Sequence, residues 1–285
     1  MKKIITLIMT ALIAVFGCMA FTGCSSDDTL VVYTEAGFAP FEYVKDGKIV
    51  GVDVDIMQKV ADELGKKLKF EDVNFDIIVD TVAKGKMTKV GAAGLSITEK
   101  RKEKVDFSTP YYTANLYVIY NASEESTYVS TTTDNTNGVY WQAFKNKKVG
   151  CQGGTTAEMF FNDEIAENGT LYENGNAVST KTSYQDYITA LSALKNGDIN
   201  VIVMDEVPAE QLIKGKSEYK CAPLYYKGEG EEKDEIACDE YAIAVTKGET
   251  EILNAINKVL GELMAEKDES GNNGIQKLVM KHFGV

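Results

Sequence analysis

The sequence predicts an α/β protein made of two successive α/β units. Short strands rich in β-branched residues alternate with amphipathic helices between residues 30 and 113, and the same alternation starts again at residue 148. Between the two series lies a polar stretch, residues 121–138, without an apolar period. Alternating strands and helices indicate parallel sheets covered by helices. A chain of 285 residues suffices for two lobes with buried cores.

The first 23 residues have the pattern of a secretory signal. Lys2 and Lys3 precede a long apolar run that ends just before Gly23 and Cys24, and a polar tether follows over residues 24–28. The sequence around Cys24, with a small residue before the cysteine, resembles the lipobox of bacterial lipoproteins. Cys24 is therefore the expected lipidation site. An N-terminal transmembrane anchor is the alternative, and the polar residues after Cys24 disfavour it. No later stretch is long and apolar enough to span a bilayer.

The first α/β unit starts after this tether. Its expected elements are, in order, strand 30–34, hairpin 42–50, helix 53–66, strand 68–73, helix 75–84 and strand 90–95. A short helix follows, and it carries Arg101. Either Ser96, which forms a capping box with Glu99, or Thr98 caps this helix.

The second unit follows strand 117–120 and the polar stretch 121–138, which we expect to be a loop or a hairpin insertion. Thr155 and Glu158 form a capping box that opens its first helix. The other expected elements are strand 148–151, strand 178–180, helix 183–195, strand 201–204, helix 206–214 and strand 219–225. Strand 241–245 and two helices are left over at the C-terminus and must pack on one of the units.

Charge and cysteine content restrict the partners and the chemistry. The formal net charge is −13, and removal of residues 1–23, which hold two lysines and no acids, makes it −15. This charge disfavours nucleic acids and anionic membranes as partners. Besides Cys24, the secreted part keeps Cys151, Cys221 and Cys238, and no Cys/His cluster indicates a metal site. A Cys221–Cys238 disulfide is an open alternative outside the cytoplasm.

Arg101 is the only arginine of the sequence. All other basic residues are lysines, apart from His282. A single arginine suits the rigid two-pronged binding of a carboxylate, which lysine does poorly. A structural ion pair within the short helix is the equally weighted alternative.

Three groups of motifs together resemble one family, and the resemblance covers nearly all of the chain after the signal segment. They are Phe38-Ala-Pro-Phe-Glu42 with Gly51-Val-Asp-Val-Asp55, Gly94-Leu-Ser-Ile-Thr-Glu-Lys-Arg101 with Val105-Asp-Phe-Ser108 and Pro110-Tyr-Tyr112, and Gly154-Thr-Thr156 with Met204-Asp-Glu206 and Tyr241-Ala-Ile-Ala-Val245. They resemble the family 3 amino-acid-binding extracellular solute receptors of ABC importers, such as the histidine, lysine/arginine/ornithine and glutamine binders.

The resemblance implies a two-lobed (Venus flytrap) fold with two hinge crossings and a ligand clamped between the lobes. Lobe 1 would comprise residues 29–113 and 240–285, and lobe 2 would comprise residues 114–239. The implied partners are a small-molecule amino acid and the transmembrane subunits of an ABC permease. The expected protein is a monomer without a cofactor, held outside the cytoplasm at the membrane by its lipid anchor.

The resemblance also implies roles for ligand-binding residues. Arg101 matches the arginine that binds the ligand α-carboxylate, and Asp205 matches the carboxylate that takes the ligand ammonium. Gly94 and Ser96 match positions that bind through backbone groups and a hydroxyl. The backbone amide of Thr156 lies at a helix N-terminus, which suits an anion.

A second group of matched positions would surround the ligand side chain. Phe38 and Phe75 would sandwich it, with ordinary core packing as the alternative. Glu35 would face its head group, with a solvated loop acid as the alternative, and Gln152 and Met204 are further candidates. Because a buried unpaired carboxylate disfavours an aliphatic ligand, Glu35 favours a polar, cationic L-amino acid.

Other functions compete with this interpretation. A receptor for glutamine or cystine is one, and an enzyme similar to the cyclohexadienyl dehydratases, which share the fold, is another. A catalyst needs a perturbed acid or base in the cleft. Glu35 is the one plausible base, because His282 lies outside the matched motifs. A sensor domain would need a membrane span or a kinase after it, which we do not expect. We therefore expect no enzyme activity.

Overall fold

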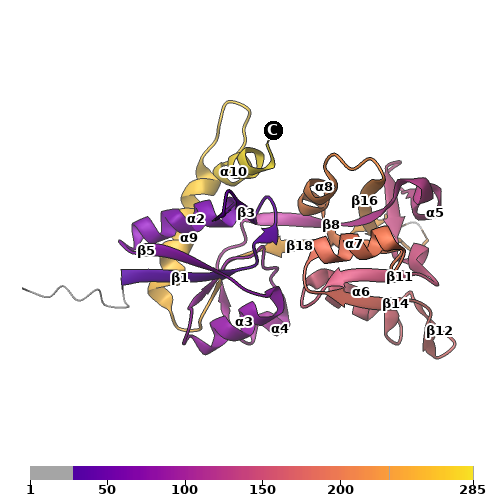
Figure 1. Ribbon diagram of the computed structural model, residues 1–285, viewed down its shortest axis with the longest axis horizontal. Helices are drawn as coiled ribbons and strands as arrows, with labels where there is room; N and C mark the ends of the chain where they lie inside the picture. Colours follow the sequence, from indigo (N-terminus) through magenta and orange to yellow (C-terminus); the bar gives the residue numbers. More distant parts are fainter. Residues whose placement is uncertain (1–27, 231, 285) are drawn as a thin grey trace, which may run out of the picture.

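The chain forms two α/β lobes that are joined by a pair of strands (Figure 1). The computed structural model describes residues 28–230 and 232–284, so the signal segment and Cys24 lie outside the described residues. The long strand β8 (Tyr112–Asn121) runs from the first lobe into the second. Strand β18 (Cys238–Tyr241) runs back antiparallel to it, with Tyr241 opposite Tyr112.

The first lobe is built on a sheet with the strand order β5-β1-β6-β19-β7. These strands are β1 (Thr29–Thr34), β5 (Lys67–Asp72), β6 (Val90–Gly91), β7 (Asp106–Phe107) and β19 (Ala244–Val245). The first strand pairs in parallel with β5 and β6, as the alternation of strands and helices predicts. The C-terminal strand β19 pairs antiparallel with β6 and β7. The left-over C-terminal segment therefore returns to the first lobe.

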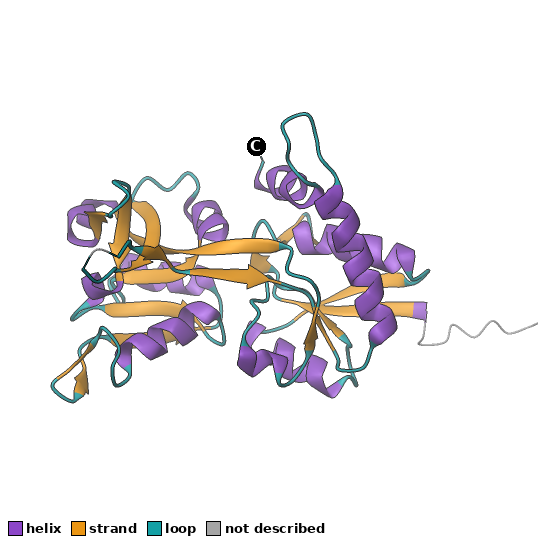
Figure 2. Ribbon diagram, turned by 180° about the vertical axis from the view of Figure 1, so that it is seen from behind, coloured by secondary structure: helices purple, strands orange, loops and turns teal. Residues whose placement is uncertain are grey.

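Helices lie on both faces of the first-lobe sheet (Figures 1 and 2). They are α2 (Val52–Glu63), α3 (Phe75–Lys84), α4 (Glu99–Lys102), α9 (Thr250–Ala265) and α10 (Gly274–Phe283). The fully buried Ile56 and Val60 on α2 face the core, as their helical spacing predicts. A separate small sheet of β2 (Gly37–Phe38), β3 (Glu42–Lys45) and β4 (Lys48–Val50) precedes α2.

The second lobe is built on a mixed sheet with the order β14-β11-β15-β8-β16-β10-β9. Apart from β8, its strands are β9 (Val129–Thr131), β10 (Asn137–Tyr140), β11 (Lys148–Gln152), β14 (Thr180–Tyr184), β15 (Val201–Asp205) and β16 (Tyr219–Tyr226), with β17 (Glu235–Ile236) beside β16. Its helices are α5 (Glu125–Tyr128), α6 (Thr156–Ile165), α7 (Tyr187–Asn196) and α8 (Glu206–Ile213). Short 3-10 turns, η2 (Ala122–Glu124) and η3 (Trp141–Phe144), and a hairpin of β12 (Tyr172–Glu173) and β13 (Asn176–Ala177) complete it.

Several predicted boundaries are wrong. The helix expected from Ser183 begins at Tyr187, because residues 180–184 pair in parallel with β11 and Asp186 caps the helix instead. The strand expected over 241–245 is divided into β18 and β19, which belong to different sheets. The polar stretch 121–138 forms short helical turns and an antiparallel hairpin of β9 and β10, one of the two predicted alternatives.

The Cys221–Cys238 disulfide is not formed, and both cysteines are free. Cys221 on β16 pairs with Ile119, whereas Cys238 on β18 pairs with Asn115. These partners are four residues apart on one strand, which is about 13 Å at roughly 3.3 Å per residue. A disulfide needs Cα atoms within about 7 Å of each other.

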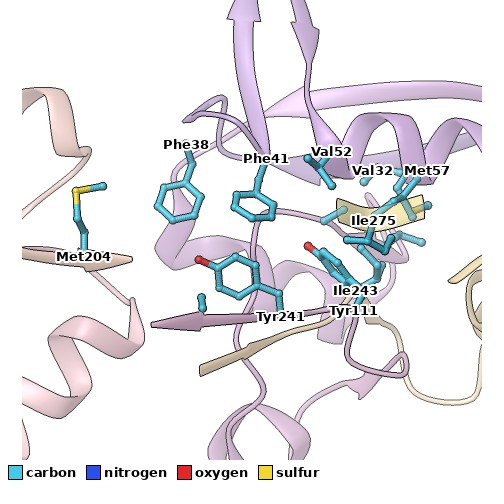
Figure 3. Close-up of a cluster of buried hydrophobic side chains, with 14 of the residues drawn as sticks. Val32, Phe38, Phe41, Val52, Met57, Tyr111, Met204, Tyr241, Ile243 and Ile275 are labelled. Carbon is cyan, nitrogen blue, oxygen red and sulfur yellow. The ribbon is translucent and has the colours of Figure 1, made fainter. Parts of the chain in front are cut away.

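The core of the first lobe reaches the boundary between the lobes. Figure 3 shows Phe38 and Phe41 above Tyr241, with Val52 and Met57 of the same buried cluster on the side of Phe41 away from Phe38. The ring centroids of Phe41 and Tyr241 are 5.1 Å apart in an edge-on arrangement. This packing fixes Phe38, at the edge of the cluster, in a defined position.

Candidate functional site

A cavity lies between the two lobes and is lined by residues from both. The lining comprises Glu35, Phe38, Phe75, Ala93, Gly94 and Ser96 of the first lobe and Gln152, Thr155, Thr156 and Asp205 of the second. The cavity is nearly closed, with a volume of about 10 Å³, which is room for about one water molecule. Its position suits a small molecule that contacts both lobes at once, and such a molecule would enter only when the lobes move apart.

The lobes also contact each other directly around this cavity. Arg101 Nη2 donates a hydrogen bond of 2.9 Å to the carbonyl oxygen of Gly154, and the hydroxyls of Ser96 and Thr156 are 3.1 Å apart. Gly154 has φ +80°, and a Cβ built on it would lie 3.0 Å from the Cα of Asp76. Glycine therefore permits both the left-handed backbone and the close approach of the lobes at this position.

Aromatic rings form part of the cavity wall. Phe38 is 8% exposed and lies 6.1 Å from the ring of Tyr187 on the second lobe in a stacked arrangement. Phe75, the first residue of α3, lies under the guanidinium of Arg101, 5.6 Å from ring centroid to Cζ. Aromatic faces of this kind bind the apolar stem of a ligand side chain and attract cations.

Glu35 supplies a carboxylate from the loop between β1 and β2. Burial raises the pKa of Glu35 to about 7, although Gln152 and the Gly37 amide donate hydrogen bonds to it. A Cβ built on Gly37 would lie 2.7 Å from Oε1 of Glu35, so glycine leaves space for the carboxylate. A carboxylate held in such a place favours a cationic partner.

Asp205 supplies a second carboxylate, at the end of β15 where α8 begins. It is 8% exposed, and its Oδ1 makes no hydrogen bond of standard geometry with the described residues, although the Tyr241 hydroxyl lies near the carboxylate. Burial, followed by the charge of Asp239, raises the pKa of Asp205 to about 8. An ammonium group beside this oxygen would satisfy both the missing hydrogen bond and the buried charge.

Two hydroxyls and the arginine lie near Asp239 at the border of the cavity. Ser96 Oγ donates to Asp239 Oδ2 at 3.2 Å, and the Thr156 hydroxyl donates to the same oxygen. Arg101 is 5% exposed, and its Nη1 donates a hydrogen bond of 2.6 Å to the carbonyl oxygen of Ser96. Burial lowers the pKa of Arg101 to about 10, which leaves it a cation at neutral pH.

Local structure positions these groups. Thr98, rather than Ser96, caps α4 by accepting a hydrogen bond from the Arg101 amide. Thr155 caps α6 by accepting from the Glu158 amide, as predicted. The Glu158 carboxylate, however, accepts from the Gly154 amide, so the reciprocal half of the predicted capping box is absent.

The structure brings together most of the residues that the sequence singles out. The predicted ligand-binding residues that line the cavity are Glu35, Phe38, Phe75, Gly94, Ser96, Gln152, Thr156 and Asp205. Arg101 lies behind this lining with its guanidinium on two backbone carbonyls. Met204 is buried in the second lobe, on the side of Phe38 away from Phe41 (Figure 3), and is not part of the lining.

Sequence reasoning missed Asp239, Ala93 and Thr155. Asp239 stands 143 residues after Ser96, and its position on the returning strand β18 brings it to the border of the cavity. The sequence did contain one indication of this position. Asp239 lies two residues before Tyr241, and side chains two residues apart on a strand point to the same face. Ala93 and Thr155 adjoin predicted residues in the same loops.

The single histidine lies away from the cavity. His282 lies in the last turn of α10, where its Nε2 is 2.8 Å from Asp55 Oδ2, and it does not line the cavity. In the described part of the chain, no three His, Cys, Asp or Glu residues are grouped to hold a metal ion. None of the described helices combines the length and the apolarity that crossing a membrane requires. The cavity itself presents aromatic rings and carboxylates, which attract cations.

Comparison with known proteins gives one consistent result. The sequence profile of the bacterial extracellular solute-binding proteins, family 3, matches residues 30–284. The arginine-binding extracellular protein ArtP of Bacillus subtilis is 26% identical over 99% of this chain and 98% of its own. The L-cystine-binding protein TcyJ of Escherichia coli is 28% identical over 90% of this chain and 83% of its own.

Solved structures agree with these sequence matches. An amino acid ABC transporter substrate-binding protein from Streptococcus pneumoniae, crystallised with L-arginine, superposes with a TM-score of 0.73 and is 30% identical, over 91% of this chain and 96% of its own. An ancestral arginine-binding protein bound to arginine superposes with a TM-score of 0.71 and is also 30% identical, over 90% of this chain and 99% of its own.

Proposed function

The chain belongs to the bacterial extracellular solute-binding proteins of family 3, and from this premise we propose that it binds a cationic L-amino acid between its lobes and delivers it to an ABC permease. The observation that carries the choice of ligand is the pair of carboxylates, Glu35 and Asp205, that line one cavity from opposite lobes. Burial raises the pKa of each, so a ligand with two cationic groups gains most by binding there. Arginine-binding relatives support this choice.

The proposed pose places the ligand α-ammonium on Asp205 and the side-chain cation on Glu35. Phe38 and Phe75 would enclose the apolar stem between these two charges, with Gln152 beside the head group. The α-carboxylate would lie towards Ser96, Thr156 and Arg101. Because the two carboxylates come from different lobes, such a ligand holds the lobes together.

Glutamine is the second candidate ligand. Because the pKa of Glu35 is about 7, its carboxyl is partly protonated at neutral pH and can also donate a hydrogen bond to a neutral amide. A related ancestral arginine-binding protein has been crystallised with glutamine.

We propose a non-catalytic role in place of the dehydratase alternative. Glu35, the only candidate base from the sequence, lies where a cationic head group would neutralise it, and His282 is engaged with Asp55. Turnover of a small cyclic acid by the purified protein would contradict this assignment.

The remaining assignments concern the whole secreted protein. We assign residues 29–113 and 240–285 to lobe 1 and residues 114–239 to lobe 2, with β8 and β18 as the hinge. Lipidation of Cys24 would keep the protein at the outer face of the cell membrane, where a monomer would dock on the permease subunits. Mass spectrometry of the membrane fraction tests the lipid, and gel filtration with light scattering tests the monomer.

A thermal-shift panel of the common L-amino acids and cystine tests the ligand class. The chain of residues 25–285 is unfolded and refolded first, which removes any ligand carried through purification. A ligand at 100 times its dissociation constant stabilises by about 2.7 kcal/mol, which raises the melting temperature by about 5 °C or more. We expect arginine, lysine or histidine to give the largest shift, and citrulline, an uncharged analogue of arginine, to give a smaller one. A largest shift with glutamate or aspartate would overturn the proposal.

A further inference from the structure

Tyr241 carries a buried hydroxyl at the wall of the cavity. It is the last residue of the returning strand β18, and it is fully buried. A Cβ built on Gly94, which lines the cavity, would lie 3.3 Å from Cε2 of Tyr241, a ring carbon next to the one that bears the hydroxyl. The hydroxyl makes no hydrogen bond of standard geometry with the described residues. Because buried hydroxyls normally have a partner, this donor is one that the site can use.

The Tyr241 ring is held in place by the aromatic side chains of the first lobe and the hinge. Its centroid lies 5.1 Å from that of Phe41 and 5.7 Å from that of Tyr112. Figure 3 shows its hydroxyl pointing away from Tyr111, towards the side on which Met204 of the second lobe lies. The first lobe therefore fixes the direction of a hydroxyl that faces the second lobe.

The group that this hydroxyl faces is the carboxylate of Asp205, the residue after Met204 at the end of β15. The Oδ1 atom of Asp205 also lacks a hydrogen bond of standard geometry. Burial raises the pKa of Asp205 to about 8, and hydrogen bonding by the Tyr241 hydroxyl opposes this rise. A donor beside a carboxylate stabilises its ionised form, which is the form that binds an ammonium group.

Several other titratable groups surround this pair. Among the described residues, those that face Tyr241 or Asp205 are Asp239 on β18, Arg101 on α4, Tyr111 in the loop before β8, Tyr112 on β8 and Tyr187 on α7. All of them remain when only the Tyr241 hydroxyl is removed. The effect of this hydroxyl on Asp205 is therefore measurable separately from theirs.

We propose that Tyr241 is a positioning residue for the ligand ammonium, because its hydroxyl donates to Asp205 across the lobes and holds that carboxylate oriented and charged. This inference rests on the proposed function, since it assumes that an α-ammonium binds at Asp205. Tyr241 acts through Asp205 and not on the ligand itself. A proton and the ligand ammonium compete for the carboxylate, and the hydroxyl shifts this competition towards the ammonium.

The pH dependence of binding tests this role. Calorimetry on residues 25–285 gives the dissociation constant of L-arginine at pH 7 and pH 9 for the natural protein and for Tyr241→Phe. We expect the variant to bind about tenfold more weakly at pH 7, the effect of one hydrogen bond to a charged group. At pH 9 Asp205 is largely ionised in both proteins, so this loss should shrink to about twofold. A loss below about fivefold at pH 7, or a loss at pH 9 that is more than half of that at pH 7, overturns the inference.

A matched variant separates this role from a structural one. Tyr112→Phe removes a hydroxyl from the residue that pairs with Tyr241 in the hinge, and any loss should be the same at both pH values. A pH-dependent loss in this control would contradict the inference. Glu35 titrates in all three proteins, so its contribution cancels when they are compared. If Tyr241→Phe fails to fold by circular dichroism, 4-fluorophenylalanine in place of Tyr241 removes the donor and keeps the size of the side chain.

The two proposals fail in distinguishable ways. If no amino acid of the panel binds the natural protein, the proposed function falls and this inference falls with it. If L-glutamine binds and L-arginine does not, the cationic ligand class is wrong, and the same measurement with L-glutamine still tests Tyr241. If L-arginine binds and the loss in Tyr241→Phe does not depend on pH, only the inference is wrong.

Discussion

Replacing Asp205 with asparagine should make the protein more stable and the receptor weaker. In the folded protein, burial and the neighbouring Asp239 raise the pKa of Asp205 from 3.8 to about 8. The unfolded chain therefore releases this proton at a lower pH than the folded protein does. As a consequence, the free energy of unfolding contributed by this group falls as the pH rises from about 4 to about 8.

The size of the effect follows from the pKa difference. Each pKa unit corresponds to about 1.4 kcal/mol, so the ionisation of Asp205 costs at most about 4 kcal/mol of stability at pH 7. Asp205→Asn removes this cost, and we expect a gain of about 1–4 kcal/mol at pH 8 that shrinks to roughly a third of its size at pH 5 and vanishes below about pH 4. Loss of the buried partner of an ammonium should weaken ligand binding by about 2–5 kcal/mol, which is roughly 30-fold to several thousandfold.

Urea unfolding at pH 5 and pH 8, with calorimetry of the bound amino acid, measures both effects. Asp198→Asn is the matched control, since Asp198 is an exposed aspartate on the same lobe. A stability difference between Asp205→Asn and the natural protein that is the same at both pH values would refute the burial argument. Unchanged affinity would refute the assignment of Asp205 to the ammonium.

Three further predictions concern other charged groups. Glu35→Gln should weaken arginine binding about 30-fold and leave glutamine binding within about threefold, since a hydrogen bond to a charged group contributes about 2 kcal/mol; equal losses for both ligands in calorimetry would remove Glu35 from the head-group site. Arg101→Lys should weaken binding at least about 30-fold, because one ammonium does not reproduce the fork that contacts Ser96 and Gly154; wild-type affinity would show that the fork is dispensable. Glu42 is fully buried, and its pKa is raised, mainly by burial and next by the charges of Asp53 and Glu35. The free energy of unfolding therefore falls as the pH rises above the ordinary pKa range of glutamate. Glu42→Gln should therefore gain about 1–2 kcal/mol at pH 8 and nothing at pH 4 in urea unfolding, a typical cost for one poorly satisfied buried group; a gain at both pH values would contradict this origin.

Sequence periodicity predicted the elements that carry a strong local pattern. Helix α3 covers residues 75–84 as expected, because its apolar spacing and the left-handed Gly85 define both ends. The predicted start of α7 was wrong because residues 180–184 form a strand. They form it only through their pairing with β11. That register is a tertiary contact, which local propensity does not report.

The candidate site was predicted largely through the order of the motifs. Their matched positions named most of the residues that line the cavity, including Glu35 and Asp205. The direction in which the Arg101 side chain points was not predictable from the sequence. It is set by hydrogen bonds to two carbonyl oxygens, that of Ser96 in the preceding turn and that of Gly154 in the other lobe. Asp239 escaped for a similar reason, since its partners are brought together only by the return of β18 between the lobes.

A crystal structure of residues 25–285 with L-arginine tests the central claim most directly. The account predicts one ligand in the cavity between the lobes, with its α-ammonium within hydrogen-bond distance of Asp205 Oδ1, the oxygen that lacks a partner. Its guanidinium should lie against Glu35 between Phe38 and Phe75. A ligand bound outside this cavity, or bound in reverse with the guanidinium on Asp205 and the α-ammonium on Glu35, would contradict the account.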